Sequence, residues 1–223
     1  MDRADHTRPR SALDELAADP SSRKRFLRMA GVGAAAVLPA FLAACGDEEE
    51  TGNQFGGAGV GTASYGQGDA GIVGYAVALE QLEVAFYEEA IASGRLTGRG
   101  LELAKGFLEN ERAHVETLSG TMRNLGGTVP AEPKFSFPLE TEAGVLDTAA
   151  QIESLGAAAY LGQVARIQSK QVLAAALSIH SVEARHAAAL AQLLGRAIAP
   201  DGPFASPATS ADVLRQIRPF VSA

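Results

Sequence analysis

Two of the four histidines in the chain follow a glutamate by three positions. Glu111 and His114 form one pair, in ERAHVETL, and Glu183 and His186 form the other, in EARHAAAL. Residues three apart on a helix share a face, so each pair would present a carboxylate and an imidazole to one side. Hard carboxylate oxygens combined with imidazole nitrogens suit iron or manganese. The two pairs therefore predict metal-binding chemistry.

A second pair of segments adds two more carboxylates. LEQLEVAFY and IESLGAAAY match at several positions, which places Glu80 opposite Glu153 and Tyr87 opposite Tyr160, each 73 positions apart. The two Glu–His pairs are 72 positions apart. A near-constant offset predicts a duplicated helix hairpin. Each of four helices would then carry one inward carboxylate, and two of them would add a histidine.

Four long helices must position these side chains. Alanine-rich apolar runs favour helix, and glycines mark the expected helix ends. A long connection with three prolines, TVPAEPKFSFPLET, cannot be helix interior and separates the second helix from the third. Two short loops and one long connection fit an all-α antiparallel four-helix bundle with a crossover between helices 2 and 3. We expect the first two helices over about 70–93 and 100–125. The third should begin at Thr141, which would cap it, and the fourth should run over about 169–194. A short last helix, ADVLRQIR, would be capped by Ser210.

Four buried carboxylates need charge compensation. A buried ion costs several kcal/mol even after relaxation, whereas the net stability of a domain is roughly 5–15 kcal/mol. Two divalent cations would cancel the charge of four carboxylates. A metal-free bundle with internal Glu–His hydrogen bonds is the alternative, and the duplication of the Glu–His pair favours the metal.

From about Asp69 to its end, the chain resembles the ferritin-like superfamily, near the branch of exported bacterial ferritin-like proteins and plant desiccation-related proteins. The closing FASPATSADVLRQIRPFV is also typical of that branch. The resemblance implies a ferritin-like bundle with two Fe or Mn ions. It implies that Glu111 and Glu183 bridge the metals and that Glu80 and Glu153 bind on the outer sides. One histidine, His114 or His186, would bind each metal.

Glu83 complicates this assignment because it lies close to one turn beyond Glu80. Its counterpart in the repeat is Gly156, so symmetry favours Glu80 as the ligand. Rubrerythrin-like relatives use a comparable extra glutamate, and Glu83 stays open as an additional or alternative ligand.

Three more polar residues lie near the predicted ligands. His180 is one turn before Glu183, but its counterpart is Leu108, so we expect a packed histidine or one beside the ligands. Tyr87 and Tyr160 have two interpretations. They would act at the site, by hydrogen-bonding the ligands or donating electrons, or they would be core residues whose hydroxyls hydrogen-bond other polar groups.

The first 44 residues have the pattern of an export signal, with a cationic start and an apolar run. SRKRFLR resembles the twin-arginine signal, with Lys24 where the second arginine is usual, and LAAC resembles a lipobox that ends at Cys45. The resemblance implies cleavage before Cys45 and a lipid on its sulfur. We expect a signal peptide over 1–44, a glycine-rich acidic tether over 45–68 and the bundle domain over 69–223. The export motif comprises Arg23, Lys24, Arg25, Phe26 and Leu27.

The composition limits the partners of the chain. A net charge of −7 argues against nucleic acid, because phosphates need a basic surface. One cysteine excludes an internal disulfide. We expect a bacterial, extracytoplasmic lipoprotein, periplasmic or on the cell surface, that is anchored in the membrane through Cys45. The tether and tail suit a monomer or small homo-oligomer better than a storage cage.

Three functions share the predicted ligands. The first is di-metal oxidoreductase chemistry with oxygen or peroxide, either Fe(II) oxidation or peroxide consumption. The second is a non-catalytic stress-related or binding protein that the metal stabilises. The third is disproportionation of peroxide, as in manganese catalases. The residues alone do not separate them, and the first agrees best with the resemblance.

Overall fold

The computed structural model describes residues 65–222. The predicted signal peptide, Cys45 and most of the predicted tether lie outside the described residues. Tyr65, near the end of that tether, is buried and packs its ring on Tyr75 with centroids 6.3 Å apart. The described helices are α4 (Gly68–Ala92), α5 (Gly98–Asn124), α6 (Glu142–Gln163), α7 (Lys170–Leu193) and α8 (Ser210–Ile217), with short 3₁₀ turns at Val164–Arg166 and Arg218–Phe220.

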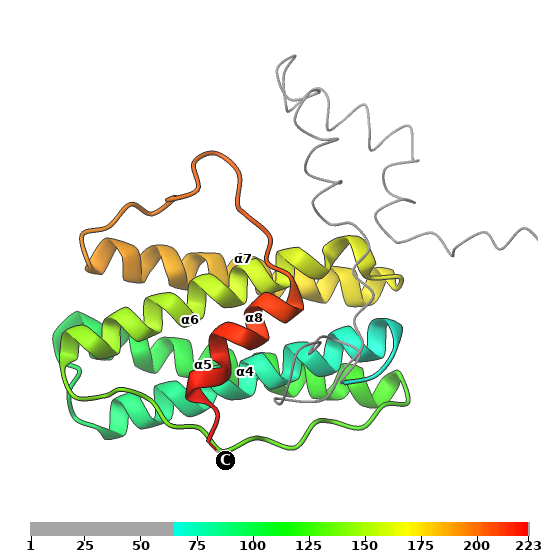
Figure 1. The fold of residues 1–223 in the computed structure, drawn as a ribbon, viewed down its shortest axis with the longest axis horizontal. Helices are drawn as coiled ribbons and strands as arrows, with labels where there is room; N and C mark the ends of the chain where they lie inside the picture. Colours follow the sequence, from blue (N-terminus) through cyan, green and yellow to red (C-terminus); the bar gives the residue numbers. More distant parts are fainter. Residues whose placement is uncertain (1–64, 223) are drawn as a thin grey trace, which may run out of the picture.

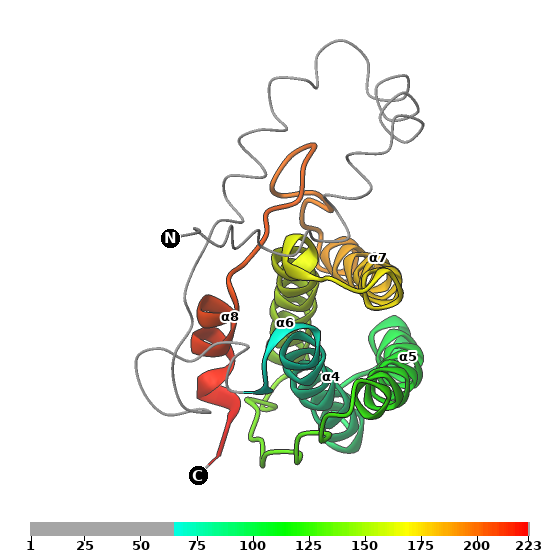
Figure 2. The ribbon, with the colours of Figure 1, turned by 90° about the vertical axis from the view of Figure 1, so that its right-hand side faces the viewer.

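The four long helices form an antiparallel bundle (Figures 1 and 2). Helix α4 pairs with α5, and α6 pairs with α7; viewed end-on, α6 lies beside α4 and α7 beside α5. The connection over residues 125–141 crosses the length of the bundle before α6 begins. This arrangement confirms the predicted all-α bundle with a crossover between its second and third helices and a short C-terminal helix.

Helices α4 and α6 have no distinct polar face. A helix of this kind must be buried on most sides by other parts of the chain, and both helices are. Helix α8 packs on α6, and Phe137 from the crossover packs edge-on against Phe86 of α4, with centroids 5.2 Å apart. A β-bridge between Phe135 and Val221 joins the crossover to the C-terminal tail. The outer faces of α5 and α7 keep the polar residues.

Close backbone contact holds the segment before α8 on α6. The amide of Ala208 donates to the carbonyl of Ala158 at 3.0 Å. A Cβ at Gly162 would lie 1.9 Å from the Ala208 carbonyl oxygen, so the contact requires glycine at this position.

Two of the predicted caps can be compared with the structure. Thr141 caps α6, as predicted, with its hydroxyl accepting from the Gly144 amide at 3.1 Å. The prediction for α8 was one residue off: Thr209 is the cap, because its hydroxyl accepts from the Asp212 amide at 3.1 Å. Both hydroxyls satisfy amides that have no partner within the first helical turn.

The duplication extends to the way that the two hairpins hold each other. Asp69 on α4 accepts hydrogen bonds from the amides of Gln168 and Ser169, at 2.8 and 2.7 Å. Glu142 on α6 accepts from the amide and hydroxyl of Thr97, at 2.8 and 2.9 Å. Thr97 and Ser169 precede α5 and α7 as their N-caps. Each hairpin therefore supplies the carboxylate that holds the start of the other hairpin's second helix.

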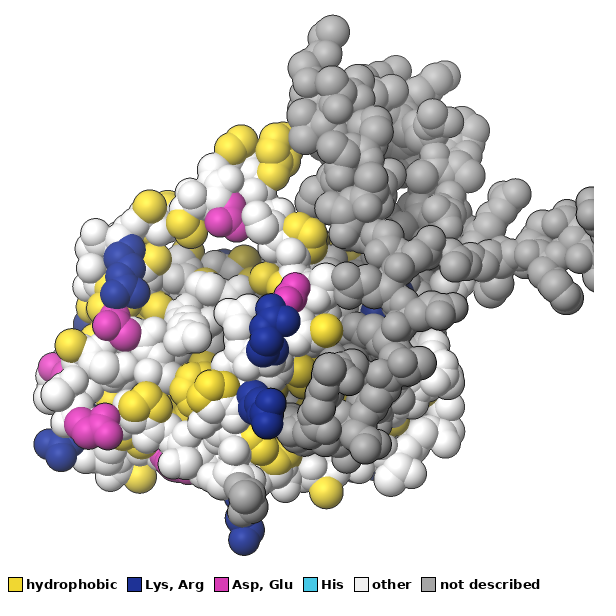
Figure 3. Space-filling model, viewed as in Figure 1, with side chains coloured by type: hydrophobic (Ala, Val, Ile, Leu, Met, Phe, Trp, Pro, Cys, Tyr) yellow, Lys and Arg dark blue, Asp and Glu magenta, His cyan; other side chains and the backbone are white. Residues whose placement is uncertain are grey.

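The face crossed by α8 carries scattered basic and acidic side chains among hydrophobic ones (Figure 3). Among the described helices, none combines the length and apolar character needed to span a bilayer.

Candidate metal centre

The fold brings the six predicted ligands together between the four long helices. They form two groups, and within each group one ligand atom per residue lies within 4.8 Å of the others. Both groups contain Glu111 from α5 and Glu183 from α7. The first group is completed by Glu80 and His114, and the second by Glu153 and His186. Either group could hold a metal ion.

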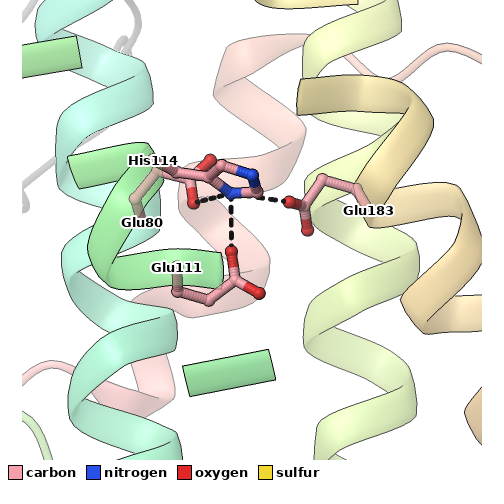
Figure 4. A group of neighbouring side chains, drawn as sticks. All are labelled: Glu80, Glu111, His114 and Glu183. Carbon is pink, nitrogen blue, oxygen red and sulfur yellow. Dashed lines mark hydrogen bonds and ion pairs between the residues drawn. The ribbon is translucent and has the colours of Figure 1, made fainter. Parts of the chain in front are cut away.

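In the first group, His114 is surrounded by carboxylates (Figure 4). Its Nδ1 lies 2.7 Å from Glu111, 3.2 Å from Glu80 and 3.2 Å from Glu183. These three glutamates come from α4, α5 and α7 and have fully buried side chains. One imidazole nitrogen therefore faces three carboxylates at the position where a cation would be held.

The second group has the same plan and an extra support. The Nδ1 of His186 lies 3.0 Å from Glu111 and 3.2 Å from Glu153. Its other ring nitrogen, Nε2, lies 2.9 Å from the side-chain amide of Asn110, and Phe107 stacks on the ring with centroids 3.9 Å apart. A histidine that binds metal through one nitrogen usually needs a partner for the other.

Sequence reasoning missed Asn110. The counterpart of this residue in the repeat is Val182, so the duplication that revealed the ligands gives no signal for it. Its position directly before Glu111 also places it on a different side of the helix from the ligands.

The two tyrosines bind ligands of the opposite hairpin. Tyr87 on α4 donates to Glu153 on α6 at 2.5 Å, and Tyr160 on α6 donates to Glu80 on α4. Burial and these adjacent carboxylates raise the pKa of both phenols well above the usual range. Each hydroxyl therefore keeps its proton and fixes one oxygen of a predicted ligand.

Burial raises the pKa of three of the carboxylates, those of Glu80, Glu83 and Glu183. It raises the pKa of Glu183 and Glu83 well above the usual range, and the surrounding glutamate charges raise it further. Burial also raises the pKa of Glu80 to about 7, although the hydrogen bond to His114 lowers it. For Glu111, the hydrogen bonds to both imidazoles outweigh burial, and its pKa is lowered.

The imidazoles respond in the opposite direction. Burial lowers the pKa of each histidine, but hydrogen bonds to the carboxylates outweigh it. The pKa of His114 rises to about 12 through Glu111, Glu183 and Glu80. That of His186 rises to about 9 through Glu111 and Glu153. Without metal, protons on these groups supply the positive charge that the carboxylates require.

Glu83 lies beside the two groups but belongs to neither. It is 2 % exposed, and its carboxylate occupies space that a side chain at position 156 would fill. A Cβ at Gly156 would lie 2.7 Å from Oε1 of Glu83 and 3.4 Å from Oε2 of Glu183. The glycine in one half of the repeat thus makes room for the extra glutamate of the other half.

His180 points its Nδ1 at the backbone carbonyl of Ala157, at 2.9 Å. This contact fits the expectation of a packed histidine.

The donor set fits a metal. One carboxylate oxygen, Oε2 of Glu183, has no hydrogen-bond partner among the described residues, although the residue is fully buried. A buried carboxylate oxygen without a partner is costly, and a cation between the two groups would satisfy it. The oxygen and nitrogen donors present are those that iron and manganese accept.

Comparison with known proteins identifies the family. The sequence profile of the ferritin-like domain matches residues 68–196, which includes all four long helices and all six predicted ligands. The chain belongs to the ferritin-like family. The ferritin-like domain is similar in fold to the crystal structure of a conserved hypothetical protein from Mycobacterium tuberculosis, with 20% identity and a TM-score of 0.52. That match covers 57% of this chain and 90% of the other. A search of the curated proteins found no match.

Without metal, the ferritin-like domain should lose thermal stability as the pH rises from about 5 to 9. The raised pKa values of Glu80, Glu83 and Glu183 give stability that is complete below 4.5 and is lost as the pH rises through their folded values. His186 adds a loss between 6.5 and about 9. A loss of about 2 kcal/mol would lower the Tm by about 4–8 °C. Calorimetry in chelator measures this change.

The metal-loaded protein is the control, because a bound cation favours the deprotonated ligands. Its Tm should stay level or rise over the same pH range. A metal-free Tm that rises from pH 5 to 9 would contradict the assigned proton positions.

Gly156→Ala should destabilise the domain by about 1–3 kcal/mol, because the new methyl group displaces the Glu83 carboxylate. With Glu83→Ala also present, the methyl group should fit, and the higher helix propensity of alanine should stabilise by up to about 1 kcal/mol. Urea unfolding of the four chains measures this coupling.

Gly106→Ala is the matched control, since Gly106 is an exposed helical glycine on α5 with no atom near its Cβ position. Its effect should be equal with and without Glu83→Ala. An equal effect of Gly156→Ala in both backgrounds would show that Glu83 does not occupy this space.

Proposed function

We propose that this protein is a ferritin-like metalloprotein that binds two iron or manganese ions and oxidises Fe(II), or reduces oxygen or peroxide. The observation that carries the proposal is that the two ligand groups share Glu111 and Glu183. Glu111 and Glu183 would serve both ions, and one histidine and one further glutamate would complete the residues that hold each ion. Di-iron and di-manganese carboxylate bundles use the same ligand types, with the same distribution over four helices.

Charge balance supports two ions. The four central carboxylates carry four negative charges when ionised, and the interior does not tolerate them unpaired. Protons on the histidines and glutamates meet that need without metal. Two divalent cations would replace those protons and leave the six ligands deprotonated.

The chemistry of the site would be a two-electron transfer. Held by the six ligands, iron would supply this redox chemistry: two Fe(II) become two Fe(III) for each dioxygen that takes up two protons and is reduced to hydrogen peroxide. The chain's own residues bind and orient: Tyr87 holds Glu153, Tyr160 holds Glu80, and Asn110 supports the ring of His186.

A metal-stabilised protein without turnover is the second candidate. The observation that favours it is the buried Oε2 of Glu183, which has no hydrogen-bond partner among the described residues, because a cation that satisfied this oxygen would stabilise the fold by binding alone. The two candidates predict the same stoichiometry and differ in whether the bound metal reacts. A manganese form that evolves oxygen from peroxide would instead indicate catalase-like activity.

The purified full chain should bind about two Fe(II) per chain after anaerobic reconstitution, as the paired ligand groups require. On admission of oxygen, the bound iron should oxidise faster than free Fe(II) at the same pH. Glu183→Ala should abolish most of this binding and oxidation, because Glu183 belongs to both groups. Metal analysis and the absorbance of Fe(III) follow the two steps.

Glu116→Ala is the matched control, since Glu116 is an exposed glutamate on α5; it should retain both properties. Less than one equivalent of Fe or Mn per wild-type chain would exclude the proposed centre. Two equivalents without accelerated oxidation, by oxygen or peroxide, would support the stabilising role.

We also propose that the domain works outside the cytoplasm as a membrane-anchored lipoprotein and as a monomer or small homo-oligomer. The support is the sequence alone: SRKRFLR, the apolar run and LAAC before Cys45. Two acyl chains on one cysteine suffice for stable membrane anchoring.

Cys45→Ser should move the protein from the membrane fraction to the soluble or unprocessed fraction of the producing bacterium, because the lipid has no other attachment point in a chain with one cysteine. Fractionation with immunodetection, together with labelling by a radioactive fatty acid, measures this shift. Equal membrane association and equal labelling of both chains would contradict lipid attachment at Cys45.

A further inference from the structure

An apolar cavity of about 20 Å³ lies between all four long helices. Hydrocarbon side chains provide most of its wall. Those that matter here are Val73 and Ala76 on α4, Leu118 on α5, Ala159 and Tyr160 on α6, and Ala176 on α7.

The cavity adjoins the metal centre along the bundle axis. Ala76 precedes Glu80 by four residues, and Leu118 follows His114 by four, so each lies about 6 Å from a ligand along its helix. Tyr160 belongs to both places: its ring lines the cavity, and its hydroxyl donates to Glu80. The Tyr160 side chain therefore reaches from the cavity to one of the predicted ligands.

The two ends of the duplicated centre differ in how they are filled. At the other end, the ring of Tyr87 packs against Phe86 and Phe107, with centroids 5.1 and 5.8 Å apart. The counterpart of Phe86 in the repeat is Ala159, which lines the cavity. Equivalent positions of the repeat thus hold the phenyl ring of Phe86 at one end of the centre and the methyl group of Ala159 at the other.

Size and polarity select the occupant. A cavity of roughly 10–15 Å³ is the smallest that holds one water-sized molecule, and apolar cavities favour apolar guests such as xenon over water. The cavity therefore admits one very small apolar molecule. Two residues of its wall, Thr121 on α5 and Ala175 on α7, are partly exposed, so the wall reaches the surface where α5 faces α7.

We propose that this cavity binds molecular oxygen and passes it to the metal centre beside Tyr160. The inference rests on the proposed function in that the centre consumes oxygen, whereas binding in the cavity needs no metal. Hydrogen peroxide, which is polar and hydrogen-bonding, does not use this site.

Xenon tests the cavity independently of any reaction. In the metal-free full chain, the methyl resonances of Val73 and Leu118 should shift as xenon pressure rises, while that of Val213 on α8, which does not line the cavity, should not. Ala176→Leu fills the cavity and should remove the shifts. Absence of xenon-dependent shifts at Val73 and Leu118 in the wild-type chain would overturn the proposal, even if the centre oxidises iron.

Oxygen kinetics test the route. Ala176→Leu should slow Fe(II) oxidation by oxygen several-fold and raise the KM for oxygen, while metal stoichiometry and the rate with hydrogen peroxide stay unchanged. Ala174→Leu makes the same change at an exposed position of α7 and should behave as the wild type.

A smaller change, Ala159→Val, repeats the test if leucine at position 176 prevents folding, and it should raise the KM for oxygen in the same direction. Equal oxygen kinetics in the cavity variants and Ala174→Leu would overturn the route. If the wild-type chain binds no metal, the proposed function fails, and the xenon shifts still decide whether the cavity takes a small apolar guest.

Discussion

The concentration of carboxylates in a dry interior is the constraint on which the rest of the structure depends. Five glutamates lie almost without exposure between four helices, and charged groups in such an environment must be paired, protonated or bound to metal. Two histidines, two tyrosine hydroxyls and protons on glutamate meet that demand in the metal-free chain. Helix α8 and the crossover cover α4 and α6 with apolar side chains. This cover excludes water, so the buried carboxylates still need a proton, a partner or a metal.

The duplication makes the centre, and departures from it give the centre its individual properties. Glu80 and Glu153 occupy equivalent positions in the repeat, and so do Tyr87 and Tyr160, which donate hydrogen bonds to them. Glu83 has no counterpart, and Gly156 supplies the space that its carboxylate needs. Asn110 supports His186, whereas the position equivalent to Asn110 in the other half holds a valine. The two halves of a nearly symmetric site therefore differ in charge and in support.

Much of this could be read from the chain because its strongest signals are local. The Glu-x-x-His pairs and the proline-containing connection are short patterns, and the repeat is visible as short matching segments at a constant offset; together they predicted the bundle and the grouping of the six residues. Asn110 and the cavity beside Tyr160 depend on which side chains meet across helices, which spacing does not encode. The cap of α8 was misplaced because threonine and serine stand side by side and serine is the more favoured cap by type, whereas the Thr209 hydroxyl is the one that accepts from the Asp212 amide.

The links between the hairpins have a consequence for how the protein matures. Asp69 and Glu142 hold the opposite hairpin's helix starts, and Tyr87 and Tyr160 hold the opposite hairpin's ligands. Neither hairpin alone contains a complete ligand group, since each group draws on both. Contacts within a hairpin join residues that are closer in sequence than those joined across the crossover. A metal ion held by either group would therefore require both hairpins to be folded and packed together.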